Sequence, residues 1–123
     1  MSKVLIVDDE SHLRLLYETE LRRAGFETMA AANAMQGLEF VETMKPDLVI
    51  LDIRMAGMDG IEALQRILER DNSIPVVLNT AFSSYRDNYL TWAADAYVTK
   101  SSDVTELVDT VQDLLESDVT ARN

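Results

Sequence analysis

The sequence contains no cysteine and only one histidine, His12. The absence of cysteine excludes a disulfide framework, a thiolate zinc site and catalysis by a cysteine nucleophile. One histidine cannot form a histidine metal cluster. Basic residues are also scarce: 11 Lys and Arg stand against 22 Asp and Glu, so the formal net charge is −11. This excess of acid argues against direct contact with nucleic acid or an anionic membrane, because the phosphates would be repelled.

Long hydrophobic runs are absent as well, and no stretch approaches the length of a membrane-spanning helix. The N-terminus leads directly into an apolar run without the layout of a signal peptide. The sequence therefore predicts a cytoplasmic protein. With 123 residues, 47% of them hydrophobic and 27% charged, the composition is typical of one globular domain. We expect that domain to span 1–123, with a core over 1–116 and a polar tail over 117–123.

Short apolar runs alternate along the chain with segments of helical spacing. In the last helical segment the apolar residues form a single stripe, with Leu107, Val111 and Leu114 at helical intervals. The strand-like runs are rich in β-branched residues and nearly continuously apolar, which is typical of a sheet covered on both faces. They occupy 4–7, 27–32, 47–51, 75–78 and 96–99, and the second is the weakest.

Helix boundaries agree with this interpretation. Gly25 lies where the first helix should end in a left-handed conformation. Pro46 should stop the second helix, and Pro75 should open the fourth strand. Five strand–helix units with right-handed crossovers predict an α/β fold with a doubly wound, five-stranded parallel sheet. Three polar pairs are typical of an N-cap residue and its partner: Asn33 with Gln36, Asp59 with Glu62, and Asp103 with Glu106.

Residues with chemically active side chains follow four of these strands: Asp8 and Asp9, then Asp52, Thr80 and Lys100. In a doubly wound sheet, ligands bind beyond the carboxyl ends of the strands. A strand order of 2-1-3-4-5 would bring all five residues to one edge of the sheet. Three carboxylates there would repel one another by about 4 kcal/mol per close pair. The cluster therefore predicts a hard divalent cation, and Mg²⁺ suits carboxylates that lie beside phosphate oxygens.

A carboxylate beside Mg²⁺ also suggests phosphoryl transfer, because a carboxylate can act as a nucleophile and form an aspartyl phosphate. Asp52 is the best-placed nucleophile, since the central strand carries it between the other groups. The Thr80 hydroxyl can donate a hydrogen bond to a phosphoryl oxygen from the next strand. Lys100 lies two strands away, roughly 10 Å, and its long side chain can cover much of that gap.

Over essentially its whole length the sequence resembles the receiver domains of two-component response regulators, with a chemotaxis-regulator-like layout. The resemblance rests on five motifs in order: VLIVDDE at 4–10, PDLVILDIRM at 46–55, GMDG at 57–60, TA at 80–81 and DAYVTK at 95–100. It implies a flavodoxin-like (βα)5 three-layer sandwich and phosphotransfer from a phosphohistidine on a sensor histidine kinase or phosphotransfer protein. It further implies that the protein is not an enzyme for a separate substrate and promotes only its own phosphorylation and dephosphorylation.

Carried over by position, the resemblance implies a role for each acidic residue. Asp52 is the expected phosphoacceptor. Asp9 and Asp52 are the expected direct Mg²⁺ ligands, joined by the backbone carbonyl of Arg54. Asp8 is expected to act on the metal through water.

The resemblance also implies a switch. Thr80 and Lys100 are the expected phosphoryl-sensing pair, and Tyr97 falls where the family has a switch aromatic. Phosphoryl oxygens would draw Thr80 inward, and the vacated space would admit the Tyr97 ring. This would remodel the face of the fourth helix, fifth strand and fifth helix, where a downstream protein or output domain would bind. From the residues alone, plain core packing of Tyr97 is an equal alternative.

Four positions depart from the family pattern. Ser101 stands where a proline in a cis peptide usually follows the lysine, and a cis bond before serine would cost about 3 kcal/mol more than trans. Ala56 replaces a common proline, and Ala93 replaces a frequent glycine. Asn79 puts a polar group where an apolar residue is usual. None of them removes an acid, the hydroxyl or the amine, so they bear on rates and switching.

Two other functions are alternatives. A pseudo-receiver would keep the fold as a protein-interaction module that does not switch by phosphate, and Ser101 and Ala93 leave this alternative open. A flavin carrier or hydrolase on the same fold ranks last, because no glycine-rich phosphate loop follows the first strand. We expect a monomer or a phosphorylation-promoted dimer, acting alone or as part of a longer regulator.

Overall fold

A computed structural model describes residues 1–81, 93–101 and 103–122. The helix expected between the fourth and fifth strands lies outside the described residues, so the fifth expected helix carries the label α4. The elements are β1 (Lys3–Val7), α1 (Ser11–Arg23), β2 (Glu27–Ala31), α2 (Ala34–Met44), β3 (Leu48–Leu51), α3 (Gly60–Arg70), β4 (Val76–Thr80), β5 (Ala96–Thr99) and α4 (Thr105–Arg122).

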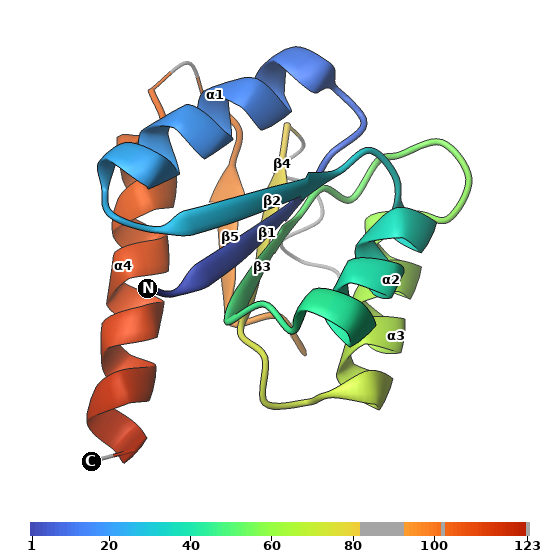
Figure 1. The fold of residues 1–123 in the computed structure, drawn as a ribbon. Coiled ribbons are helices and arrows are strands. Elements are labelled where there is room, and N and C mark those ends of the chain that lie inside the picture. Colours follow the sequence, from blue (N-terminus) through green and yellow to red (C-terminus); the bar gives the residue numbers. More distant parts are fainter. Residues whose placement is uncertain (82–92, 102, 123) are drawn as a thin grey trace.

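The five strands form one parallel sheet in the order β2-β1-β3-β4-β5, which confirms the predicted topology. Helices α2 and α3 lie on one face of the sheet, and α1 and α4 lie on the other (Figure 1). The central strands β3 and β4 are buried along their whole length, whereas β2 at the edge is partly exposed. This difference explains why only the second run was weakly apolar in the sequence.

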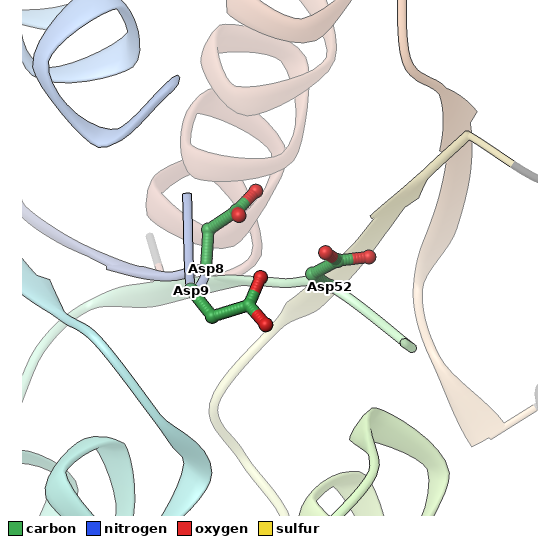
Figure 2. A group of neighbouring side chains, drawn as sticks. All are labelled: Asp8, Asp9 and Asp52. Atoms are coloured by element: carbon green, nitrogen blue, oxygen red, sulfur yellow. The ribbon is translucent and has the colours of Figure 1, made fainter. Parts of the chain in front are cut away.

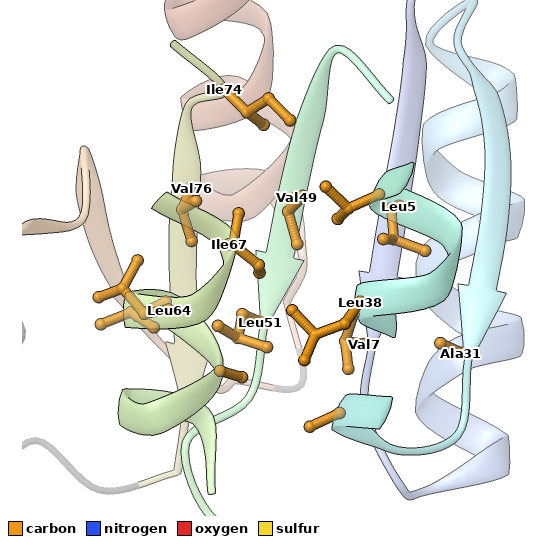
Figure 3. Close-up of a cluster of buried hydrophobic side chains, with 14 of the residues drawn as sticks. Leu5, Val7, Ala31, Leu38, Val49, Leu51, Leu64, Ile67, Ile74 and Val76 are labelled. Carbon is orange, nitrogen blue, oxygen red and sulfur yellow. The ribbon is translucent and has the colours of Figure 1, made fainter. Parts of the chain in front are cut away.

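Each face of the sheet has its own hydrophobic core. On the side of α2 and α3, Leu64 and Ile67 of α3 and Leu38 of α2 pack against strand residues such as Val49 and Leu51 (Figure 3). A second cluster on the side of α1 and α4, named the α1/α4 core here, contains Val4, Ile6, Tyr17, Leu21, Leu48, Ile50, Val77, Val98, Leu107, Val111 and Leu115. Each fully buried aliphatic side chain contributes about 1.5–3 kcal/mol, so the two cores fix the sheet between its helices.

The helix boundaries largely follow the predicted signals. Asn33 and Asp59 are the N-caps of α2 and α3, and each side chain accepts a hydrogen bond from the backbone three residues later. Gly25 has φ +100°, as expected after α1. The C-cap of α2 is Lys45 in a left-handed conformation, directly before Pro46, which was predicted to stop this helix. Asp103 instead accepts from the backbone and hydroxyl of Thr105.

The last helix is longer than expected. It continues through Arg122, whereas the sequence predicted a polar tail from residue 117. The extension contains neither glycine nor proline, and a helix can continue past its apolar stripe where neither residue stops it. Within the described residues, none of the helices is long and apolar enough to cross a membrane.

Candidate functional site

The site forms at the carboxyl ends of the central strands. Asp8 directly follows β1 and Asp52 directly follows β3, and the residues before them, Val7 and Leu51, are paired in the sheet. The backbone N–H of Asp52 also donates to the carbonyl of Val7 at 3.0 Å. As a result, carboxylate oxygens of Asp8, Asp9 and Asp52 lie within 4.8 Å of one another (Figure 2). The predicted convergence of the three acids is confirmed.

Two hydrogen bonds fix the loop after β1. The N–H of Glu10, which precedes α1, donates to Oδ1 of Asp8 at 3.0 Å. From the first turns of α1, the Arg14 guanidinium donates to the backbone carbonyl of Asp8 at 2.8 Å. Asp8 is 2% exposed, whereas its neighbour Asp9 is exposed. One acid therefore lies inside the site and the next lies at its mouth.

The loop after β3 depends on a close backbone approach by Gly60 at the start of α3. The Gly60 N–H donates to the carbonyl of Ile53 at 2.7 Å. A Cβ at this position would overlap the Asp52 carbonyl oxygen and lie 2.6 Å from the Ile53 Cα. Only glycine fits there without a shift of the backbone that carries Asp52.

Lys100 connects the far strand to these acids. Its ammonium nitrogen lies 2.9 Å from Oδ2 of Asp8 and 3.0 Å from Oδ2 of Asp52, and its side chain is 13% exposed. Its backbone N–H donates to the Thr80 carbonyl at 2.7 Å, which fixes the start of the side chain beside β4. The predicted reach of Lys100 across the sheet is thus present in the structure.

Burial and charge act in opposite directions on these groups. Burial raises the pKa of Asp52, and the Asp8 charge adds to that effect, while the hydrogen bond and charge of Lys100 oppose it. For Lys100 itself, burial lowers the pKa, but Asp8 and Asp52 outweigh burial and raise the pKa to about 12. Lys100 is therefore fully protonated at neutral pH and neutralises part of the acidic cluster.

The residues present fit a divalent cation. Counted at their formal charges, three carboxylates and one ammonium give a net charge of −2, which one Mg²⁺ would balance. Carboxylate oxygens are ligands that Mg²⁺ accepts, usually one or two at a time with waters completing an octahedron. A pocket of about 380 Å³ lies beside Asp9, and Arg54 and Asp59 are also among its lining residues.

The other predicted site residues lie on β4, on β5 and in the loop after β3. Thr80 ends β4 and is fully buried, and the backbone of Arg54 hydrogen-bonds to the Asp52 carboxylate. Tyr97 on β5 is partly buried and packs against the core on the side of α2 and α3. The peptide bond between Lys100 and Ser101 is trans, as expected without a proline.

Three aromatic residues between the fourth and fifth strands, Tyr85, Tyr89 and Trp92, lie outside the described residues. From the sequence alone, a partner surface and core packing are equal alternatives for them.

Comparison with known proteins identifies the family. The family model for the response regulator receiver domain matches residues 4–112. The chain belongs to the response regulator receiver domain family. Among curated proteins, this receiver domain is 44% identical over 80 residues to sporulation initiation phosphotransferase F of Bacillus subtilis, covering 65% of the chain and 64% of that protein. It is 37% identical over 118 residues to the regulatory protein AtoC of Escherichia coli, covering 94% of the chain and 26% of AtoC.

Solved structures agree with the receiver domain assignment. The response regulator TrrA of Thermotoga maritima in complex with Mg²⁺-BeF has a TM-score of 0.90 and 39% identity, covering 93% of this chain and 99% of that one. TrrA bound to the histidine kinase ThkA has a TM-score of 0.88 and 40% identity, covering 94% and 99%. The receiver domain thus spans the whole of some structural relatives, but less than two thirds of the curated relatives named above.

Two residues beside the site, Tyr17 and Asn79, were not among the predicted site residues. Tyr17 of α1 is buried in the α1/α4 core at 3% exposure. Asn79 was noted only as a departure from the family pattern, and it is 2% exposed. A hydroxyl in an apolar stripe and an amide in an apolar strand were the available signals.

Proposed function

We propose that this receiver domain accepts a phosphoryl group on Asp52 from the phosphohistidine of a sensor histidine kinase or phosphotransfer protein. The observation that carries the proposal is the buried contact of Lys100 with both Asp8 and Asp52, with the Asp9 carboxylate beside them. The solved complex of TrrA with a histidine kinase supports the class of partner.

In the proposed reaction, a carboxylate oxygen of Asp52 attacks the phosphorus atom. The new O–P bond forms as the P–N bond to the histidine breaks, and the electron pair of that bond stays on the imidazole nitrogen. The contact with Lys100 favours the ionised form of Asp52, and a carboxylate needs no separate base to act as nucleophile. The Lys100 ammonium stabilises the negative charge on a phosphoryl oxygen as transfer proceeds.

We propose Asp9, Asp52 and the backbone carbonyl of Arg54 as direct ligands of Mg²⁺, with Asp8 acting through water. When bound, the cation neutralises charge on the phosphoryl oxygens. Asp9 is exposed at the mouth of the site, where a hydrated cation can reach it, whereas Asp8 is buried and oriented by the Glu10 N–H. The pocket beside Asp9 and Arg54 would admit the donor.

Phosphorylation would then switch the face that contains β5 and α4. Thr80 would move toward the phosphoryl group, and Tyr97 would occupy the space that it leaves. A downstream protein or output domain would bind this face. We expect Tyr97→Ala to leave phosphorylation intact and to weaken partner binding after phosphorylation. Equal partner affinity of wild type and variant, with and without phosphate, would remove Tyr97 from the mechanism.

The deciding experiment is incubation with Mg²⁺ and acetyl phosphate, followed by intact-mass measurement. We expect one phosphoryl adduct in the wild type, none in Asp52→Asn and none when Mg²⁺ is chelated. Asp71→Asn is the matched control, because Asp71 follows α3 at the opposite end of the sheet and is exposed. It should form the adduct as wild type does.

An adduct that persists in Asp52→Asn would place the phosphoacceptor elsewhere. No adduct in the wild type, together with no Mg²⁺-dependent change in the fluorescence of Trp92, the single tryptophan, would favour a pseudo-receiver that binds partners without phosphate. The reaction concerns only the domain's own phosphorylation and hydrolysis, so no separate substrate is turned over.

A further inference from the structure

Asn79 is a buried polar residue that the proposed reaction does not use. It lies in β4, whose five residues are all buried, and it is 2% exposed. Its amide nitrogen has no hydrogen-bond partner among the described residues. A buried amide without a partner is costly, so its presence in the fully buried strand β4 calls for a physical role.

The sheet register places Asn79 next to the phosphorylation site. Ile6, Ile50 and Val77 are lateral neighbours on three adjacent strands, and all three side chains belong to the α1/α4 core. Side chains two residues further along each strand point to the same face. Continuing that row by two residues gives Asp8, Asp52 and then Asn79. The amide is therefore on the strand next to Asp52 and on the same side of the sheet.

Lys100 leaves β5 on this same side. Ala96 and Val98 both pack in or against the α1/α4 core, and Lys100 follows Val98 by two residues. Val98 is the sheet partner of Asn79. To bring its ammonium to Asp8 and Asp52, at 2.9 and 3.0 Å, the Lys100 side chain must cross β4 on the face that carries Asn79.

Tyr17 of α1 approaches Asn79 and Lys100 from the helix that covers this face of the sheet. It is 3% exposed in the α1/α4 core. Burial raises the pKa of Tyr17, the Asn79 side chain acts against that rise, and the charges of Lys100, Asp8 and Asp52 all act on the phenol. The phenol thus lies beside the Asn79 amide and within electrostatic range of the three charged groups, although Nδ2 does not reach hydrogen-bonding geometry with it.

We propose that Asn79 and Tyr17 are positioning residues for Lys100, which hold its ammonium toward Asp52 from the α1 side of the sheet. The proposal rests on the proposed phosphorylation of Asp52. The amide and phenol dipoles line the path of the Lys100 side chain where other residues of the face are apolar, so they favour one placement of a nearly buried ammonium. Because Lys100 neutralises the transferred group, its placement sets the rates of both phosphorylation and hydrolysis.

The test uses Asn79→Leu and Tyr17→Phe, which keep the side-chain size and remove the polar groups. Each variant should slow phosphorylation by acetyl phosphate, and hydrolysis of the adduct, by about fivefold, which corresponds to about 1 kcal/mol in the barrier. In a Lys100→Met background, the same substitutions should change neither rate. A polar-to-apolar control at the same helix–sheet interface is Thr28→Val, whose hydroxyl donates to Glu18 away from the site. It should leave the rates unchanged.

A second measurement reads Lys100 directly in the unphosphorylated protein. The chain has three lysines, Lys3, Lys45 and Lys100, so ¹⁵N-lysine labelling gives few ammonium signals. We expect the Lys100 ammonium protons to exchange with solvent about fivefold faster in Asn79→Leu and Tyr17→Phe than in wild type. Thr28→Val should not change their exchange.

These measurements separate the two proposals. If the wild type accepts no phosphoryl group, the proposed function fails, and the exchange of the Lys100 ammonium still decides whether the pair positions it. Unchanged exchange in both variants would overturn the pair. So would rate losses of the same size with and without Lys100, because they would reflect a general packing defect, which the thermal midpoint would also report.

Discussion

Removal of the Lys100 ammonium should destabilise the fold by a measurable amount. Lys100→Met keeps most of the aliphatic stem but leaves the carboxylates of Asp8 and Asp52 without their shared partner. The pKa of Lys100 rises from 10.5 to about 12 in the folded protein. At 1.36 kcal/mol per pKa unit, this corresponds to about 2 kcal/mol of stabilisation. Removing one partner of a fully buried pair costs about 3–5 kcal/mol, and the 13% exposure of Lys100 is consistent with a smaller value.

The pH dependence of this loss has a defined sign. A raised lysine pKa stabilises the fold fully below pH 10.5, and that stability disappears only as the pH rises through about 12. Burial raises the pKa of Asp52, so ionised Asp52 costs stability at neutral pH. In Lys100→Met that cost grows, and it disappears as the pH falls and Asp52 takes up its proton. The difference from wild type should therefore be largest near pH 7 and shrink toward acid pH.

Urea unfolding followed by circular dichroism, in buffer with a chelator, measures this difference. Lys45→Met is the control, because Lys45 is exposed at the end of α2, and it should match wild type. Added Mg²⁺ should stabilise Lys100→Met more than wild type, since it replaces the missing positive charge instead of competing with an ammonium. Equal stability of Lys100→Met and wild type at pH 7 without Mg²⁺ would refute the electrostatic account of the site.

Three further predictions test the framework around the site. Gly60→Ala should lower the free energy of unfolding by more than about 2 kcal/mol and strongly slow phosphorylation, because its Cβ would overlap the Asp52 carbonyl. Its control is Gly57→Ala, where the Cβ meets open space at φ +81°, and there the loss should be about 1 kcal/mol. Asn33→Ala removes the N-cap of α2 and should cost about 1 kcal/mol in urea unfolding, with an unchanged phosphorylation rate. Ile67 is 1% exposed, so Ile67→Ala should lower the free energy of unfolding by about 3 kcal/mol. A loss under 1 kcal/mol would show that neighbouring side chains on the side of α2 and α3 move in to fill the cavity.

The sequence predicted most of the fold because the relevant signals are local. The continuous apolar runs specified buried strands, and Asn33, Asp59 and Gly25 marked helix ends through hydrogen bonds and backbone angles within a few residues. The predicted end of the last helix was wrong: α4 continues to Arg122, since a helix without glycine or proline can continue past its apolar stripe. Strand order followed only from requiring the reactive residues to meet at one edge, and the structure confirms it.

By itself, then, the sequence determined which segments are strands and helices and which polar residues stand at the strand ends. Only the tertiary structure decided that one ammonium contacts both Asp8 and Asp52, and that Tyr17 and Asn79 face the same charged groups. The physical reason is the range of the interactions. Caps and periodicity act over a few residues, whereas lateral neighbours depend on sheet register and helix packing, which the whole core sets at once.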